Sequence, residues 1–414
     1  MVVVGAGVAG LCTALYAARR GLDVTVVERD GPERFTTSFG NAGLLTPSHF
    51  VPLAAPGVVG QGLRWMRDPE SPFYIRPRLN PDLARWGWWF WRTGSAAHVE
   101  RAAPVLRDLN LASRALFADL ARERDDFGLV LRGGLMVCKT PHALDEEAAV
   151  ARHARRLGLE AELLDADALV RMEPDARIAA AGAVFYPQDG YLDPARFMAS
   201  VAARAEEAGA QFRWHTDVAG WDAAPGRVEA IRTGEGRIEA DTFVVAAGAW
   251  TTALVRPLRL RLPMQAGKGY HLNLPAERLR LRLRHSLILV EGRVAVTPMG
   301  ETVRFAGTME IAGLDPAVNP ARIRGITKTV PQYLPDVPAA TFAGAKPWVG
   351  LRPLSPDGLP YVGPFRRFPN LFAATGHAMM GLSLGPVTGE AVAALAAGEA
   401  PPLPLAALSP DRFR

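Results

Sequence analysis

The chain has 414 residues and a formal net charge of +5, from 47 basic and 42 acidic side chains. At 49% hydrophobic and 21% charged, it has the composition of an ordinary globular protein that is long enough for two domains. The positive charge does not indicate nucleic-acid binding, because nearly all of it is arginine scattered along the chain. Two cysteines, Cys12 and Cys138, are too few for a disulfide framework.

The first twenty residues predict the phosphate-binding turn of a dinucleotide fold. An apolar run at Val2–Val4 is typical of a strand buried on both faces of a parallel sheet. The pattern G-x-G-x-x-G follows at Gly5, Gly7 and Gly10. The first glycine allows a tight turn, the second lets the backbone approach a pyrophosphate, and the third allows close helix–strand packing. A helix over residues 8–20 then directs its N-terminal amides toward the phosphates.

A carboxylate stands where such folds bind ribose. Residues 23–28 predict a second strand that ends in Glu28. It follows Gly10 at close to the roughly twenty-residue spacing at which an acid accepts hydrogen bonds from ribose hydroxyls. The glycine pattern alone is weak, but a strand before it, a helix after it and this acid make the dinucleotide prediction strong. NAD and FAD both satisfy these features.

Three stretches are apolar enough to be considered as membrane segments. Residues 35–63 and 368–389 lack charged side chains, but prolines and glycines interrupt them, so we expect loops that line something apolar. The segment RWGWWFWR at 85–92 is compatible with an interfacial anchor and with a helix buried on most sides, of which we favour the second. Because the nucleotide turn begins at residue 5, we expect no signal peptide and a cytoplasmic protein.

The rest of the chain predicts a mixture of helices and strands. Helices are expected over 80–125, 142–157, 163–174 and 194–208, and hairpins over 129–140 and 227–240. Other strands are expected from 210, over 241–250 and, antiparallel, over 258–310, before a final strand, glycine loop and helix at 370–397.

This order decides between the two dinucleotides. Nucleotide-type elements occur at the start, near 195–250 and again at 370–397, with antiparallel strands between them. A nicotinamide dehydrogenase usually completes its doubly wound sheet in one continuous block. A discontinuous nucleotide domain, with a second glycine loop at 376–389, suits a flavin that is held from both ends of the chain. We therefore predict FAD.

Six motifs occur in order along the whole chain. They are VVVGAGVAG…VVERD, TTSFGNAG, FVVAAGAW, KGYHL, WVGLRPLSPDGLPYVG and NLFAATGHAMMGLSLGPVTG. With them the chain resembles the D-amino-acid oxidase superfamily of FAD-dependent amine oxidoreductases, and most of all its bacterial D-amino-acid dehydrogenases and glycine oxidases. The form GHAMMGLSLGPVTG is similar to dehydrogenases of D-proline and cis-4-hydroxy-D-proline breakdown.

The resemblance implies an α/β fold with a discontinuous Rossmann-like FAD-binding domain of the glutathione-reductase type, and an α+β substrate domain built on an antiparallel sheet. We place the FAD-binding domain at 1–80, 175–255 and 345–414, and the substrate domain at 81–174 and 256–344. The implied FAD contacts are Gly5, Gly7, Val8, Ala9, Gly10, Glu28, Arg29, Ser38, Asn41, Ala42, Gly43, Leu44, Val218, Ala247, Gly248, Trp250, Gly350, Gly376, Met380, Gly381, Leu382, Ser383 and Leu384.

Three residues are candidates for the substrate site. Arg352 matches the family's carboxylate-binding arginine, and its planar guanidinium suits two-point recognition of a carboxylate. Tyr270, in KGYHL, is expected as a second wall or hydrogen-bond donor. His377, in the glycine loop, contacts flavin or substrate or only braces the backbone, and both alternatives stay open.

Two departures from the family pattern are informative. Glycine oxidases carry a second arginine where this chain has Met379, which indicates a roomier and more apolar pocket. Relatives that attach flavin covalently use a histidine where this chain has Asn41, or a cysteine late in the chain, and no cysteine follows Cys138. Non-covalent FAD is the expectation, and no metal site is predicted.

The expected activity is oxidation of a D-amino acid by hydride transfer from Cα to flavin N5, giving an imine that water hydrolyses. The expected electron acceptor is a quinone or another carrier, and D-proline or cis-4-hydroxy-D-proline is the expected substrate. Two alternatives stay open: an oxidase that makes hydrogen peroxide, and a flavoprotein subunit of a hetero-oligomeric dehydrogenase. The tryptophan cluster slightly favours peripheral contact with the inner face of the cell membrane, and the oligomeric state is left open.

Overall fold

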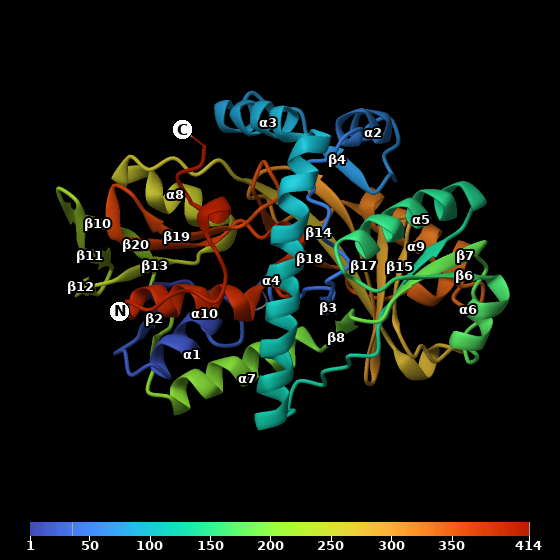
Figure 1. Ribbon diagram of the computed structural model, residues 1–414, viewed down its shortest axis with the longest axis horizontal. Helices are drawn as coiled ribbons and strands as arrows, with labels where there is room; N and C mark the ends of the chain where they lie inside the picture. Colours follow the sequence, from blue (N-terminus) through green and yellow to red (C-terminus); the bar gives the residue numbers. More distant parts are fainter. Residues whose placement is uncertain (35, 414) are drawn as a thin grey trace.

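The computed structural model describes residues 1–34 and 36–413, so Phe35, in one of the predicted loops, lies outside the described residues. Two large sheets organise the described part of the molecule, one of six strands and one of nine. In Figure 1 the six-stranded sheet lies on the left and most of the nine-stranded sheet on the right, with the long helix α4 (Ala96–Glu123) crossing the middle.

The six-stranded sheet contains the strand that precedes the predicted nucleotide turn. Its order is β19-β20-β13-β1-β2-β9, and all neighbours are parallel except β19 and β20. Its strands are β1 (Val2–Val4), β2 (Thr25–Val27), β9 (Gln211–Arg213), β13 (Phe243–Val245), β19 (Tyr361–Phe365) and β20 (Phe368–Thr375). The central strands are apolar at every position because both of their faces are covered.

Alternate residues of these strands face two different cores. Val3 and Val244 pack with helices α1, α4, α7 and α10 on one face, whereas Val2 and Val245 pack with the three-stranded sheet on the other. That smaller sheet comprises β10 (Val218–Ala224), β11 (Arg227–Thr233) and β12 (Gly236–Glu239). The period of two along each strand therefore determines which layer each valine supports.

The nine-stranded sheet forms the second half. Its order is β18-β14-β17-β16-β15-β5-β7-β6, with β4 paired to β17. The strands are β4 (Phe73–Ile75), β5 (Gly134–Cys138), β6 (Glu162–Asp165), β7 (Gly182–Tyr186), β14 (Gln265–Pro275), β15 (Ser286–Leu289), β16 (Val294–Met299), β17 (Thr302–Ile311) and β18 (Trp348–Leu354). A two-stranded pair, β3 (Leu44–Leu45) with β8 (Gly190–Tyr191), lies apart.

Several of the helices begin after a residue whose side chain caps them. Asn80, Thr140, Asp193 and Asn319 each accept a hydrogen bond from an amide of the first turn, and a proline follows each of them. The remaining bounds are α1 (Val8–Ala18), α2 (Val58–Trp65), α3 (Pro81–Thr93), α5 (Pro141–Arg156), α6 (Ala166–Met172), α7 (Pro194–Glu207), α8 (Thr251–Val255), α9 (Pro320–Tyr333) and α10 (Gly385–Ala396). No described helix is both long and apolar enough to cross a membrane.

Several local predictions are wrong. Residues 129–140 form no hairpin, because β5 pairs instead with the distant β15 and β7. Residues 162–165 are a strand rather than the start of a helix, and 58–65 are a helix within a predicted loop. Of the aromatic segment at 85–92, only Trp86 is buried, so a helix buried on most sides is also incorrect.

The proposed domain segments and the observed sheets differ in detail. Strands β4, β7 and β18 belong to the nine-stranded sheet, although their residues fall in the segments assigned to the FAD-binding domain. Helix α4 was assigned to the substrate domain, yet Leu106 and Phe117 pack in one core with α1 and α10. The discontinuity itself is present in the sheet, because β1, β13 and β20 are neighbours drawn from distant parts of the chain.

Helices α1 and α10 join the two ends of the chain. A Cβ on Gly389 would lie 2.4 Å from the backbone carbonyl carbon of Cys12, and one on Gly385 would lie 2.5 Å from Val8 Cγ2. Such distances are far below van der Waals contact, so only glycine lets these helices approach so closely. The packing places the start of α1, which follows the nucleotide turn, against the last helix.

We predict that Gly389→Ala lowers the free energy of unfolding by about 1–3 kcal/mol, because the added methyl meets backbone that no rotamer change can move. Urea unfolding measures this. Gly60→Ala is the control, since Gly60 is exposed on α2 and no atom of the described residues lies within 4 Å of an added Cβ. That change should stabilise by up to about 1 kcal/mol. Equal urea midpoints for Gly389→Ala and the parent would contradict the packing argument.

Candidate active site

A cavity of about 1030 Å³ lies where the two large sheets meet. It begins at the nucleotide turn after β1, passes the loop at 36–44 and the segment 246–250, and reaches β18 and the loop at 375–382. Its volume is at the upper end of the about 300–1,000 Å³ that ligand clefts usually span. The cavity therefore has room for a cofactor and a small substrate together.

The nucleotide turn has the geometry that its sequence predicts. Gly5 has φ +103, and a Cβ there would lie 2.8 Å from the carbonyl oxygen of Ala246. A Cβ on Gly10 would lie 1.9 Å from the carbonyl oxygen of Gly5. Ser38 Oγ accepts from the Val8 amide at 3.0 Å, which ties the loop at 36–44 to the start of α1. The turn thus presents the backbone of Gly5 and Gly7 to the cavity.

Glu28 is buried at the edge of this turn. Its Oε2 accepts from the Ala6 amide at 2.8 Å, and its Oε1 accepts from the Asp30 amide at 3.1 Å. These two bonds hold the carboxylate in the cavity wall while each oxygen keeps a lone pair for another donor. Beside it, the Arg29 guanidinium lies 4.1 Å from the ring centre of Trp250. The position and chemistry of Glu28 fit a ribose.

An unsatisfied polar atom supports a bound ligand in this half of the cavity. Thr36 lines the cavity, and its Oγ1 is buried with no hydrogen-bond partner in the described structure. A buried hydroxyl without a partner is costly, and a cofactor with polar groups would satisfy it. The glycine cradle, the carboxylate and this hydroxyl all fit a dinucleotide such as FAD.

Most of the predicted cofactor residues do line the cavity. The exceptions are Gly10, Gly43, Gly376, Ser383 and Leu384. These five support the wall from behind it: Ser383 Oγ, for example, donates to Asn110 Oδ1 at 2.7 Å and accepts from the Thr46 amide at 3.3 Å. Asn41 Oδ1 accepts from the Gly43 amide at 2.9 Å, so this side chain shapes the loop that it belongs to.

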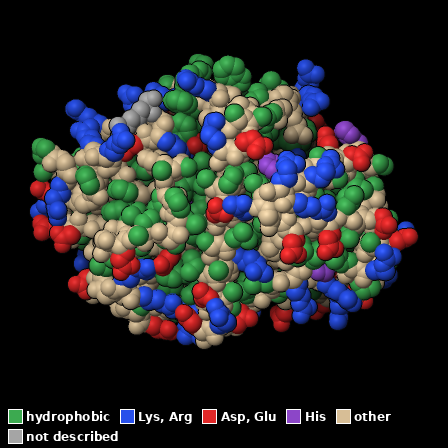
Figure 2. All heavy atoms as spheres, in the orientation of Figure 1, with side chains coloured by type: hydrophobic (Ala, Val, Ile, Leu, Met, Phe, Trp, Pro, Cys, Tyr) green, Lys and Arg blue, Asp and Glu red, His purple; other side chains and the backbone are tan. Residues whose placement is uncertain are grey.

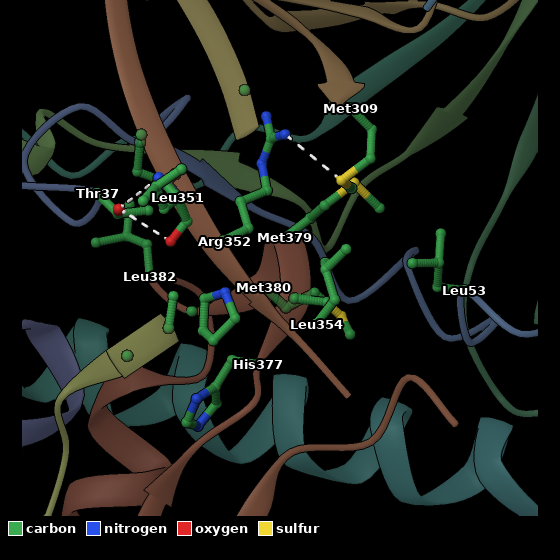
Figure 3. A pocket seen from close by; sticks show the side chains of 18 of the residues that line it. Thr37, Leu53, Met309, Leu351, Arg352, Leu354, His377, Met379, Met380 and Leu382 are labelled. Carbon is green, nitrogen blue, oxygen red and sulfur yellow. Dashed lines mark hydrogen bonds between the residues drawn. The ribbon is translucent and has the colours of Figure 1, made fainter. Parts of the chain in front are cut away.

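Arg352 is a cation within the other half of the cavity. It comes from β18, and its Nη1 donates to the carbonyl oxygen of Thr308 at 2.7 Å. In the described part of the chain, no carboxylate lies within 4.0 Å of its guanidinium. Burial lowers the pKa of Arg352 to about 10, so the group stays charged at neutral pH. Around it lie Met309, Leu354 and Met379 (Figure 3).

The neighbouring strands make room for this guanidinium. A Cβ on Gly269 would lie 2.2 Å from Arg352 Nη2, so a side chain on β14 at this position would displace the guanidinium from its place. On β17, Thr308 and Met309 form a bulge opposite Gly269, because the register shifts between Lys268 and Tyr270. Thr308 has φ 64, which is unusual for a β-branched residue, and this turns its carbonyl toward Arg352.

Tyr270 is not arranged as the predicted hydrogen-bond donor. In the register of β14 with β18, Gly267 is opposite Arg352 and Tyr270 is opposite Val349. Tyr270 and Arg352 thus point to opposite faces of the sheet. The Tyr270 hydroxyl donates to Glu310 Oε2 at 2.6 Å, in a buried network. Although Tyr270 borders the cavity, its hydroxyl is already committed.

His377 is a brace in this structure. Its imidazole is buried, and Nε2 lies 2.9 Å from Thr388 Oγ1 on α10. Figure 3 shows the ring pointing away from Arg352. Burial lowers the pKa of His377 to about 4, so the ring is neutral at physiological pH. Of the two alternatives for this residue, the contacts match support of the loop at 376–382.

Thr37, Thr308 and Met309 were missed by the sequence reasoning. Thr37 Oγ1 donates to the Leu351 carbonyl at 3.1 Å and accepts from the Leu351 amide at 2.9 Å, which fastens the first loop to β18 beside Arg352 (Figure 3). Its place in the TTSFGNAG motif was the only available signal. Thr308 and Met309 gave none, because a bulge inside an apolar strand has no distinct pattern.

We predict that Glu28→Ala weakens retention of the nucleotide cofactor by about one to two orders of magnitude, the effect of losing a charged hydrogen-bond acceptor worth about 1.5–3 kcal/mol. Equilibrium dialysis of the holoenzyme measures the loss. Glu33→Ala, an exposed acid five residues later, is the matched control and should retain the cofactor as the parent does. Parent-like retention in Glu28→Ala would refute the assignment.

Residues 1–395 match the family described as "DAO: FAD dependent oxidoreductase". The chain is 32% identical to the D-amino acid dehydrogenase of Granulibacter bethesdensis, covering 100% of this chain and 99% of that protein. It is 35% identical to the D-amino acid dehydrogenase of Cereibacter sphaeroides, covering 100% and 95%.

Solved structures share the fold. Glycine oxidase from Geobacillus kaustophilus has a TM-score of 0.78 at 24% identity, covering 99% of this chain and 98% of that chain. L-proline dehydrogenase from P. horikoshii has a TM-score of 0.74 at 19% identity, covering 100% and 96%. The family match over nearly the whole chain, with full-length relatives and the nucleotide cavity, shows that this chain belongs to the DAO family of FAD-dependent oxidoreductases.

Proposed function

We propose that the protein oxidises D-amino acids with a non-covalently bound FAD and passes the electrons to a quinone or a similar carrier. The observation that carries this proposal is Arg352, a half-buried cation without a carboxylate partner in the described structure, in the same cavity as the nucleotide turn. The names of the relatives, D-amino acid dehydrogenases that match the full chain, support the substrate class.

The residues of this chain contribute orientation. FAD, when bound, accepts the two electrons of a C–H bond next to an amine. Arg352 binds the substrate carboxylate through two parallel hydrogen bonds from its planar guanidinium. The carbonyl of Thr308, in the bulge, holds the guanidinium in place. Met309 and Leu354 exclude water from around it. The product is an imine. With a primary amine, the imine takes up water and releases ammonia as a keto acid forms, whereas the cyclic imine from a proline keeps its nitrogen, because hydrolysis only opens the ring. No side chain is needed as a base if the substrate amine is neutral.

The pocket suits a side chain larger than hydrogen. Met379 stands where the resemblance expects a second cation in enzymes built for glycine, and it is 47% exposed, at the rim of the cavity. Thioether and aliphatic walls favour an apolar or cyclic side chain. We therefore propose D-proline or cis-4-hydroxy-D-proline as the preferred substrate, within a broader D-amino-acid range.

The acceptor is proposed from the shape of the cavity. Its far end passes between α2 and α3, where Leu63 and Trp91 line it. An apolar opening suits a hydrophobic carrier such as a quinone, which would place the protein in the cytoplasm, in contact with the inner face of the cell membrane. An oxidase would use oxygen instead, and a subunit of a hetero-oligomeric dehydrogenase would need its partner chain.

We predict that D-proline or its cis-4-hydroxy derivative bleaches the flavin without oxygen faster than glycine, sarcosine or L-amino acids do. Anaerobic stopped-flow absorbance with a panel of these compounds measures the rates. Preference for glycine, sarcosine or an L-amino acid would contradict the pocket assignment. Turnover of the isolated chain with an artificial acceptor separates an enzyme from an inactive subunit, and the peroxide yield in air separates an oxidase from a dehydrogenase.

We predict that Arg352→Met lowers kcat/KM by about two to four orders of magnitude, since the substrate carboxylate loses a buried charge partner worth on the order of 3–5 kcal/mol. The kcat/KM of Arg352→Lys should lie between those of this variant and the parent, because lysine keeps the charge but cannot make the two-point contact of a guanidinium. Arg293→Met, at an exposed arginine that also lines the cavity, is the matched control. Unchanged kinetics in Arg352→Met would exclude the carboxylate role.

We predict that acid precipitation releases all of the yellow colour into the supernatant. Asn41 is not a residue that attaches flavin, and Cys12 and Cys138 are both buried in secondary structure, in α1 and β5. Absorbance of the supernatant and of the washed pellet measures the distribution. Flavin that stays in the pellet would demonstrate a covalent link.

A further inference from the structure

The outward faces of α2 and α3 carry large apolar side chains. We call these residues, Val59, Leu63, Trp88 and Trp91, the α2–α3 face; their exposed fractions are 40%, 62%, 48% and 67%. Tryptophan is rarely left open to water on a soluble surface, but it is enriched at membrane–water interfaces. In Figure 2, hydrophobic and basic side chains gather along the upper edge, where Figure 1 places α2 and α3.

Helix α3 presents this face rigidly. Trp86, on its inner side, donates from Nε1 to the Leu354 carbonyl at 2.9 Å, which anchors the helix to β18. Trp88 and Trp91 lie three residues apart on the outer side. The Arg92 guanidinium lies 5.2 Å from the ring centre of Trp88. The exposed rings are therefore held in place by the helix and need no rearrangement to meet a surface.

A second cavity, of about 790 Å³, lies on the other side of α3 and supplies positive charge. We call it the arginine groove, since Arg85, Arg256, Arg259 and Arg261 line it together with Trp88 and Trp89. Among the described residues that line it, Asp82 is the one acid. Asp82 pairs with Arg256 and lies 3.7 Å from Arg85. In the described structure no carboxylate lies within 4.0 Å of the other two arginines.

We propose that the α2–α3 face docks on a bilayer of anionic phospholipid, with headgroup phosphates in the arginine groove and Trp88 and Trp91 at the headgroup level. The positive charge of the arginine groove determines which partner fits this surface. A second copy of this chain would bring the same basic groove to a symmetric interface, where like charges repel. An anionic headgroup matches Arg259 and Arg261, which have no acidic partner among the described residues, while the apolar side chains meet the acyl region.

The main cavity opens within this face. Leu63 and Trp91 are exposed, and both also line the cavity that contains Arg352. A hydrophobic molecule in the bilayer could thus enter the cavity of a docked enzyme without passing through water. This consequence rests on the proposed quinone acceptor, whereas the docking itself rests only on the surface.

Vesicle flotation of the holoenzyme tests the docking. The protein should float with vesicles of phosphatidylcholine that contain phosphatidylglycerol, and much less with phosphatidylcholine alone or at high salt. Arg259→Ala combined with Arg261→Ala should weaken partitioning by about fivefold for each arginine. Its turnover with a water-soluble acceptor should stay unchanged. Trp88→Ser combined with Trp91→Ser should weaken partitioning by on the order of tenfold or more.

Matched controls lie at the β6–α6 end of the molecule. Arg171→Ala with Arg177→Ala changes two exposed arginines, and Leu163→Ser with Val170→Ser changes two exposed aliphatic residues; both variants should float as the parent does. No flotation with anionic vesicles, or equal losses in the control variants, would overturn the proposal. A dimer in solution that dissociates when Trp88 and Trp91 are replaced would also overturn the proposal. Flotation without oxidation of any amino acid would refute the proposed function alone.

Discussion

A charged guanidinium, half-buried in a cavity without an acidic partner in the described structure, is the constraint on which the arrangement of this site depends. Burying such a charge is unfavourable unless something compensates for it. Arg352 donates to one backbone carbonyl, from the bulge at Thr308, and its guanidinium occupies the space left by the absent side chain of Gly269. Thr37 fastens the strand that carries it to the first loop. A substrate carboxylate would complete the pairing, so the site is organised for an anion before one arrives.

The second constraint is that both ends of the chain meet at the nucleotide turn. Close packing of α1 on α10 needs glycine at Gly385 and Gly389, and β1 lies beside β13, which lies beside β20. The loop before α10 consequently lies in the same cavity as the turn after β1. A cofactor held by both is bound by segments that come together only when the whole chain has folded. This suits a cofactor that stays with the protein.

The nucleotide half could be predicted from sequence because short-range geometry determines it. The glycines after β1 and the acid after β2 have fixed roles at fixed spacing, and the structure places them so. The rest depends on distant pairing. Nothing local distinguishes a hairpin at 129–140 from a strand that pairs with β15, and only the register of β14 reveals that Tyr270 and Arg352 face opposite ways. The tryptophans of α3 suggested burial, yet helical spacing turns Trp88 and Trp91 outward.

The central claim is that Arg352 receives a carboxylate next to the flavin. Titration of the holoenzyme's visible spectrum with benzoate, and in parallel with the uncharged benzamide, tests it without turnover. Benzoate should perturb the flavin bands saturably, and benzamide should bind weaker by about two orders of magnitude, because it offers no charge to the buried guanidinium. Arg352→Met should abolish the difference. Equal affinity for the two compounds in the parent enzyme would contradict the account.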